Sequence, residues 1–175
     1  MRVYLPATMP LLARLSADGE LPLPDGFAVT ESLRAWYSEG DDEELEYAAL
    51  TAAARASLRR LAAEPDAPCR RVVIASDIPD ARISVPSGAA VDGQDQPDEP
   101  DEPGVIKITG PLRLIDIASL HVDEAGAQES VRAAARALSA ADEGDADAAF
   151  TVDAVEDYDL LWFAAQELGD LLEAS

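Results

Sequence analysis

The residues best suited to catalysis stand together on one short stretch: Ser119, His121 and Asp123. They alternate along a β-prone run, so on a strand their three side chains would share one face. A serine, a histidine and an acid are the types that serve as nucleophile, base and orienting group. Side chains two positions apart on a strand run roughly parallel, however, and seldom make the short contact between nucleophile and base. An ordinary half-exposed strand face is therefore the favoured interpretation.

A second set of candidates is basic and would bind an anion. Its members concentrate where a predicted helix ends and a predicted strand begins, and they are Arg55, Arg59, Arg60, Arg70 and Arg71. The chain holds 35 Asp and Glu against 13 Lys and Arg. Intramolecular pairing with some of these acids, together with compensation of the helix dipole, is therefore the simpler interpretation of the cluster.

The sequence predicts neither a metal site nor a cofactor. The best EF-hand-like loop begins at Asp145 and fails because Phe150 stands where glycine is required. Cys69 is the single cysteine, so the chain can form neither an internal disulfide nor a cysteine-based zinc site. The GxxxxGK[ST], GxGxxG and GxSxG motifs of nucleotide-binding proteins and hydrolases are missing from the sequence.

The composition bears on partners and location. A formal net charge of −22 would repel a phosphate backbone, so we expect no nucleic-acid binding. The apolar runs are only a few residues long, and the first residues lack the pattern of a signal peptide, so we expect a cytoplasmic protein with no membrane contact. The surplus negative charge would steer the protein toward a basic protein partner. Nothing in the sequence sets an oligomeric state.

The longest periodic segment, residues 41–63, is the helix on which we expect the fold to be organised. Asp41 and Glu44 have the spacing of a capping box, acids fill the first turns, and arginines lie toward the end. Apolar residues recur at steps of three and four, which predicts one buried stripe. The stripe consists of Tyr47, Leu50, Ala54, Leu58 and Leu61.

Shorter elements surround this helix. Strands are predicted at residues 2–5, 27–29, 71–75, 82–85, 105–109, 119–122 and 160–164, with the third in the centre of the sheet. Helices are predicted at residues 9–16, 31–37, 129–139 and 166–172, and a turn of helix is predicted around Asp116. Trp36 and Tyr37 end the second of these helices, and we expect their rings to lie against the long helix that follows, as simple core packing. Residues 142–149 are predicted to be a polar loop.

Residues 88–104 differ from the rest in composition. The run from Val91 to Gly104 carries six acids and three prolines and no basic residue, which predicts a disordered loop. The remaining pattern predicts a single α+β domain over residues 1–175. We expect a sandwich of a small mixed or antiparallel sheet with helices packed on it, and one option is a pair of split βαβ, ferredoxin-like halves.

Five segments carry a resemblance to a known family. They are MRVYLPAT, EGDDEELEYAALTAAARASL, RRVVIASDIPDA, ASLHVDEA and DLLWFAAQELGDLL. In this order they resemble a family of short, acidic, uncharacterised actinobacterial proteins. The resemblance implies a single-domain bacterial protein and assigns no activity, ligand or catalytic residue. The sequence therefore leaves two functions open, a protein-binding domain, which we favour, and a small enzyme or anion-binding domain.

Overall fold

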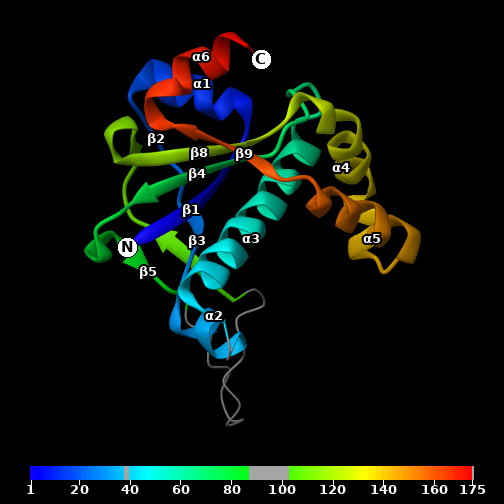
Figure 1. Cartoon of the computed structure of the whole chain (residues 1–175), viewed down its shortest axis with the longest axis horizontal. Coiled ribbons are helices and arrows are strands. Elements are labelled where there is room, and N and C mark those ends of the chain that lie inside the picture. Colours follow the sequence, from blue (N-terminus) through cyan, green and yellow to red (C-terminus); the bar gives the residue numbers. More distant parts are fainter. Residues whose placement is uncertain (38–39, 87–102, 175) are drawn as a thin grey trace.

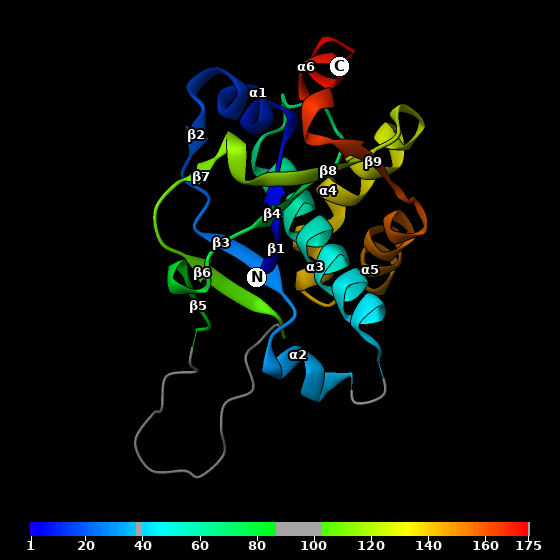
Figure 2. The same ribbon diagram turned by 60° about the vertical axis from the view of Figure 1, so that its left-hand side comes forward.

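The computed structural model describes residues 1–37, 40–86 and 103–174, and all three stretches contribute strands to one antiparallel sheet. Its order is β5-β6-β3-β1-β4-β8-β9, and β2 and β7 pair separately (Figures 1 and 2). The strands are β1 (Arg2–Ala7), β2 (Glu20–Leu21), β3 (Asp25–Ala28), β4 (Val72–Asp77), β5 (Ile83–Ser84), β6 (Val105–Ile108), β7 (Leu112–Arg113), β8 (Ile117–Asp123) and β9 (Leu160–Ala164). The helices are α1 (Met9–Asp18), α2 (Glu31–Trp36), α3 (Asp42–Ala63), α4 (Gln128–Asp142), α5 (Ala146–Asp153) and α6 (Leu168–Glu173). The predicted α+β class is confirmed.

The option of two split βαβ halves is wrong. Such halves need parallel neighbours, but every pair of neighbouring described strands in the large sheet is antiparallel. The first strand lies in the middle of the sheet, where β1 pairs with β3 on one side and β4 on the other. Strand β1 also runs past Pro6, where we expected it to stop. Pro6 is paired in register with Val73 of β4.

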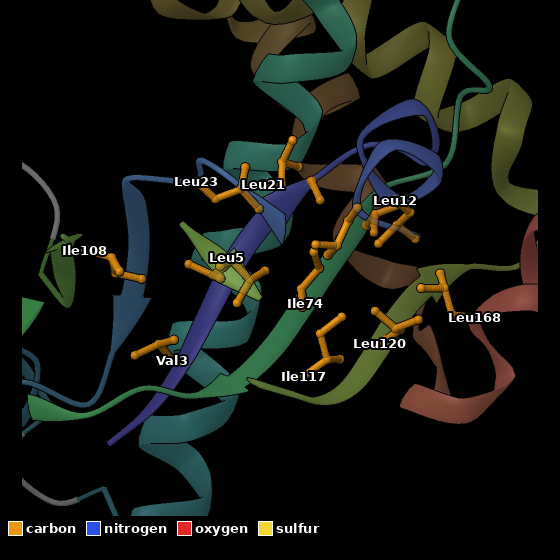
Figure 3. Packing of buried hydrophobic residues seen from close by; sticks show 14 of the residues in the cluster. Val3, Leu5, Leu12, Leu21, Leu23, Ile74, Ile108, Ile117, Leu120 and Leu168 are labelled. Carbon is orange, nitrogen blue, oxygen red and sulfur yellow. The ribbon is translucent and has the colours of Figure 1, made fainter. Parts of the chain in front are cut away.

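Helices α1 and α6 cover one face of the sheet, and Figure 1 shows them side by side. Apolar side chains of β1, β4 and β8 meet theirs in the largest buried cluster. Figure 3 shows Leu12 and Leu168 of the helices on the same side of the sheet as Leu5, Ile74 and Leu120 of the strands. This cluster fixes β8 in the sheet, because Leu120 and Val122 point into it and Ser119 and His121 must then point to the other face.

Helix α3 lies across that other face. Its capping box forms as predicted, since Asp41 Oδ1 accepts from the Glu44 N–H at 2.9 Å and Glu44 Oε2 accepts from the Asp41 N–H at 3.1 Å. The predicted stripe is correct at Ala54, Leu58 and Leu61 and wrong at Tyr47. At Leu50 it is partly correct, because this side chain packs against the buried cluster on this face. The buried residues are Leu45, Ala49, Ala53, Ala54, Ser57, Leu58 and Leu61, whereas Leu50 is half-buried and Tyr47 is 60% exposed.

Small residues explain the shift of the stripe. Ala49, Ala53 and Ser57 lie four residues apart and let the helix backbone come close to the sheet. Ser57 Oγ donates to the carbonyl of Ala7 at 2.7 Å and accepts from the N–H of Val72 at 2.9 Å, so it ties α3 to β1 and β4 together. Alanine and serine give a weak hydropathy signal, and for this reason periodicity placed the larger Tyr47 on the inner face.

A third buried cluster joins the end of α3 to α4 and α5. Helix α5 begins inside residues 142–149, which we predicted to be a polar loop, because the Asp145 side chain caps it by accepting from the Ala148 N–H at 2.9 Å. A turn of 3-10 helix at Leu114–Asp116 followed by β8 confirms the prediction around Asp116. The predicted disordered loop at residues 88–104 lies outside the described residues except for Pro103 and Gly104.

Candidate functional site

Strand β8 brings Ser119 and His121 into contact. Ser119 Oγ lies 3.2 Å from His121 Nε2, which is within hydrogen-bonding distance, although the sequence favoured no such contact. Ser119 is 5% exposed and His121 is half-buried. The two side chains share the sheet face next to β9, where His121 stands opposite Trp162.

Asp123 does not complete a triad with them. Its side chain is 0% exposed and is held by Arg71, whose Nη2 donates to Oδ1 at 2.7 Å and whose Nε donates to Oδ2 at 3.0 Å. The backbone N–H of Arg71 donates to the same carboxylate at 2.7 Å. Within the described part of the chain, the hydrogen bonds of this carboxylate all come from Arg71. Asp123 therefore stabilises the sheet and does not orient His121.

Burial and a nearby positive charge favour the neutral form of His121. Burial, and after it the positive charge of Arg2, lower the pKa of His121. Arg2 is itself paired with Asp77, with 2.9 Å between Nε and Oδ1. A neutral imidazole can accept a proton from Ser119, which is the first requirement of a nucleophile and base pair. No described carboxylate contacts the other ring nitrogen, so the third member of such a site is missing from the described residues.

The five predicted anion-binding arginines do not converge. Arg71 belongs to the buried pair with Asp123, and Arg70 donates from Nε to the backbone carbonyl of Asp123 at 2.7 Å. Arg55 faces α5 and the turn after it, where its guanidinium lies 3.4 Å from both Asp153 and Glu156. The other two members of the set lie on the final turns of α3; Arg59 is exposed and Arg60 is half-buried.

Metal-binding groups are not clustered in the parts of the chain that the structure describes. There, no three residues among His, Cys, Asp and Glu lie together in a way that could hold an ion. Cys69 is 7% exposed, and its Sγ lies 3.9 Å from the carbonyl of Ala67. The described residues also include no helix that is long and apolar enough to cross a membrane.

A broad hollow on the described surface lies between α2 and α3, and the sequence did not predict it. This α2/α3 groove has a volume of about 1180 Å³. Three aromatic rings line it, and all are well exposed: Trp36 at 60%, Tyr37 at 48% and Tyr47 at 60%. The expectation that Trp36 and Tyr37 pack in the core is wrong, because α2 contributes only Leu33 to the buried cluster beneath it.

Acidic side chains share the α2/α3 groove with the rings. Glu43, Glu44 and Glu156 line it, and among the described lining residues Arg55 alone is cationic. Arg55 is engaged by Glu156 and by Asp153 outside the groove, so the positive charge is neutralised locally. The groove therefore combines exposed aromatic faces with net negative charge. This combination suits a cation, since the face of an aromatic ring attracts positive charge.

A sequence signal for the groove does exist. Three of the nine aromatic residues fall between Trp36 and Tyr47, interleaved with acids, in a chain that is otherwise poor in aromatics.

Comparison with protein families gives one match: the model described as Family of unknown function (DUF6912) matches residues 1–172. The chain belongs to DUF6912. No curated protein and no solved structure gives a significant match.

Membership in DUF6912 confirms the resemblance inferred from the five sequence segments, namely an uncharacterised domain of unknown function. The match covers nearly all of the chain, including both β8 and the α2/α3 groove. The family assigns no role to either place. The chemistry of this DUF6912 protein must therefore be inferred from its own residues.

Proposed function

We propose that this chain is a cytoplasmic protein-binding domain that takes a basic segment of its partner into the α2/α3 groove. The observation that carries the proposal is the exposure of Trp36, Tyr37 and Tyr47 beside Glu43 and Glu44, neither of which forms an ion pair with a described residue. Large apolar side chains clustered at the surface are typical of interaction sites. The surrounding acids make a basic partner the complementary one, and the net charge of −22 would speed its approach.

Lysine and arginine side chains fit the groove in two ways. Their charged ends can lie over an aromatic face, an interaction worth about 0.5 to 2 kcal/mol. The same ends can pair with Glu43, which is exposed and sits in the first turn of α3. The acidic run at residues 92–102 is a poor ligand for this groove, because its negative charges would meet those of the glutamates that line it.

A second candidate function is a small enzyme that uses Ser119 and His121. The 3.2 Å contact between their side chains is the observation in its favour. A fluorophosphonate probe, which labels activated serines, separates this candidate from the first. Labelling that is lost in both Ser119→Ala and His121→Gln would support the enzyme. We expect no labelling, and we expect His121→Gln to keep both the fold and the binding of partners.

The groove can be tested with a 12-residue peptide that alternates arginine with serine. A Trp162→Phe background leaves Trp36 as the single tryptophan, so its fluorescence reports binding at the groove. We expect saturable binding that weakens as salt rises. Truncating Trp36 and Tyr47 to alanine should weaken binding about tenfold or more in a calorimetric titration, because two rings are lost.

An acidic protein could bind any basic peptide through its overall charge, so a second variant with the same change of charge elsewhere on the surface serves as a control. Glu43→Gln with Glu44→Gln removes two charges at the groove, and glutamine retains the capping geometry of position 44. Asp142→Asn with Glu143→Gln removes two exposed charges at the end of α4. The first double variant should bind the peptide several-fold more weakly than the second. Equal losses in the two variants would show that the bulk charge, and not the groove, binds the peptide.

A further inference from the structure

Strand β9 forms an outer edge of the large sheet and is apolar along its whole length. Its sequence from Leu160 to Ala164 is LLWFA, and it pairs with β8 on one side. None of the described strands pairs with its other side. The opposite edge, β5, is only two residues long. Natural proteins commonly protect an edge with charges, proline or a short strand, and β9 has none of these protections.

The backbone of β9 presents free hydrogen-bonding groups along this edge. The N–H of Ala164 donates at 2.7 Å to Glu167 Oε2, which is not part of β8, so it points away from the sheet. Backbone groups two residues apart on a strand point the same way. The N–H and C=O groups of Leu160 and Trp162 therefore face the open edge. Glu167 caps the last outward donor and leaves the stretch before it open to a further strand.

Side chains next to this edge are exposed on both faces of the sheet. Leu161 is 45% exposed and Trp162 is 62% exposed. Because neighbouring side chains on a strand point to opposite faces, Leu161 extends to the side of α1 and α6, and Trp162 to the side of α3. A strand added along β9 would cover part of each. Beside Leu160 lies a pocket of about 310 Å³ whose lining is partly apolar, from Leu50 and Tyr47, and partly charged, from Glu156 and Asp159.

Charge decides which strand fits. Exposed Asp157 and Asp159 precede β9, exposed Glu167 and Asp170 follow it, and residues 137–175 contain no Lys or Arg. Two copies paired antiparallel through β9 would place the acids before one strand beside the acids after the other. Each copy also carries a net charge of −22. Repulsion therefore disfavours a second copy, and a strand with basic residues at its ends is complementary.

We propose that β9 receives an extended segment of another protein, apolar in its middle and basic at its ends, as an added strand. The backbone groups of Leu160 and Trp162 provide about four hydrogen bonds, and the flanking acids set the charge preference. The site at β9 shares Tyr47 with the α2/α3 groove, but the backbone hydrogen bonds that define it come from β9 alone. The groove peptide has no apolar core and reports through Trp36, so either test can fail alone.

The probe is a nine-residue peptide, Arg-Arg-Val-Thr-Ile-Thr-Val-Arg-Arg, and its controls are the same core with glutamates at both ends and the basic peptide N-methylated at the isoleucine. We expect the basic peptide to bind and to protect the amides of Leu160 and Trp162 from hydrogen exchange in NMR spectra. The acidic peptide should bind at least about tenfold more weakly. Equal binding of both, or binding without protection of these amides, would overturn the proposal.

Two proline variants test which backbone N–H groups of β9 point to the open edge. Trp162→Pro removes an outward N–H and should keep the melting temperature within a few degrees while abolishing binding of the basic peptide, because proline is tolerated on edge strands. Leu161→Pro removes an N–H that points to β8 and should destabilise the protein strongly. Trp162→Thr keeps the N–H, so it should still bind, although more weakly. If Trp162→Pro still binds as wild type does, the edge is not the site.

Sedimentation of the protein alone tests the competing occupant. We expect a species of monomer mass that Trp162→Pro does not change. A dimer that Trp162→Pro dissociates would assign β9 to a second copy of this chain and refute the partner strand proposed here.

Discussion

Replacing Asp123 with asparagine should lower the free energy of unfolding by about 3 to 5 kcal/mol. Asp123 and Arg71 form the most buried ion pair among the described residues, with side chains 0% and 3% exposed. The substitution keeps the size of the side chain and removes its charge. Any loss therefore measures the cost of leaving the Arg71 guanidinium buried without its partner.

The magnitude follows from the hydrogen bonds. Arg71 donates to the carboxylate from its backbone N–H and from Nε and Nη2, at distances between 2.7 and 3.2 Å. Asparagine is neutral, so all of these bonds lose their charged acceptor, and its one acceptor oxygen leaves about two of them unmade. Hydrogen bonds to charged groups contribute about 1.5 to 3 kcal/mol each. Two lost bonds give about 3 to 6 kcal/mol, which includes the loss of about 3 to 5 kcal/mol that breaking one side of a buried ion pair causes. Either figure is a large part of the stability of a typical domain.

Urea unfolding followed by circular dichroism is a suitable assay, with two reference variants. Asp77→Asn breaks the pair with Arg2, whose side chains are 65% and 40% exposed, and should cost less than about 1 kcal/mol. The double variant Arg71→Met with Asp123→Leu removes both charges and should regain part of the loss. A loss below about 1 kcal/mol for Asp123→Asn, or a double variant no more stable than the single one, would refute this reasoning.

Four further predictions concern the remaining features. Because burial and then Arg2 lower the pKa of His121, its imidazole signal in NMR spectra should titrate below pH 6.5, the ordinary pKa of histidine. As the pH falls through this pKa, the wild-type protein should lose stability relative to His121→Gln. Titration at or above pH 6.5 would contradict this. Burial and then a nearby glutamate raise the pKa of Tyr4 to about 12. The contribution of neutral Tyr4 to the free energy of unfolding is therefore complete below about pH 10 and is lost toward pH 12. In urea unfolding, Tyr4→Phe should reduce this loss of stability at alkaline pH. Leu58→Ala should lower the free energy of unfolding, measured in urea, by about 2 to 5 kcal/mol, because Leu58 is 1% exposed. A loss below about half a kcal/mol would show that Leu58 does not lie on the buried face of α3. A Gly/Ser linker in place of residues 92–102 should leave the melting temperature nearly unchanged, because loop length costs little free energy; a fall of several degrees would show that the segment stabilises the domain.

Local chemistry made parts of the fold predictable. The start of α3 could be assigned because Asp41 and Glu44 have capping side chains at the right spacing, and both hydrogen bonds form. Strand β4 was recognised because its β-branched run is short and fully apolar. Both features depend on residues close in sequence, which periodicity and capping rules describe well.

Features set by distant contacts could not be predicted in the same way. The inner face of α3 depends on how closely a helix can approach the sheet, and Ala53 there carries almost no hydropathy signal. Strand order depends on which edge each strand joins, so periodicity alone could not exclude the split βαβ option. At the candidate sites, the contact of Ser119 with His121 depends on rotamers, and the exposure of Trp36 depends on how α2 sits on α3. A sequence pattern specifies neither.

If the chain is cut once between residues 86 and 103, the two fragments should stay bound to each other. The first fragment would hold β5, β3, β1 and β4, and the second would hold β6, β8 and β9. Strand β6 is inserted between β5 and β3, and β8 is attached to the far side of β4, so the second fragment pairs with the first at two separate places in the large sheet. Strand β7 pairs with β2 at a third place. Such a nicked protein would show two bands on a denaturing gel and would elute from a sizing column as the uncut protein does. The same arrangement lets the two halves, made as separate chains, rebuild the sheet between them.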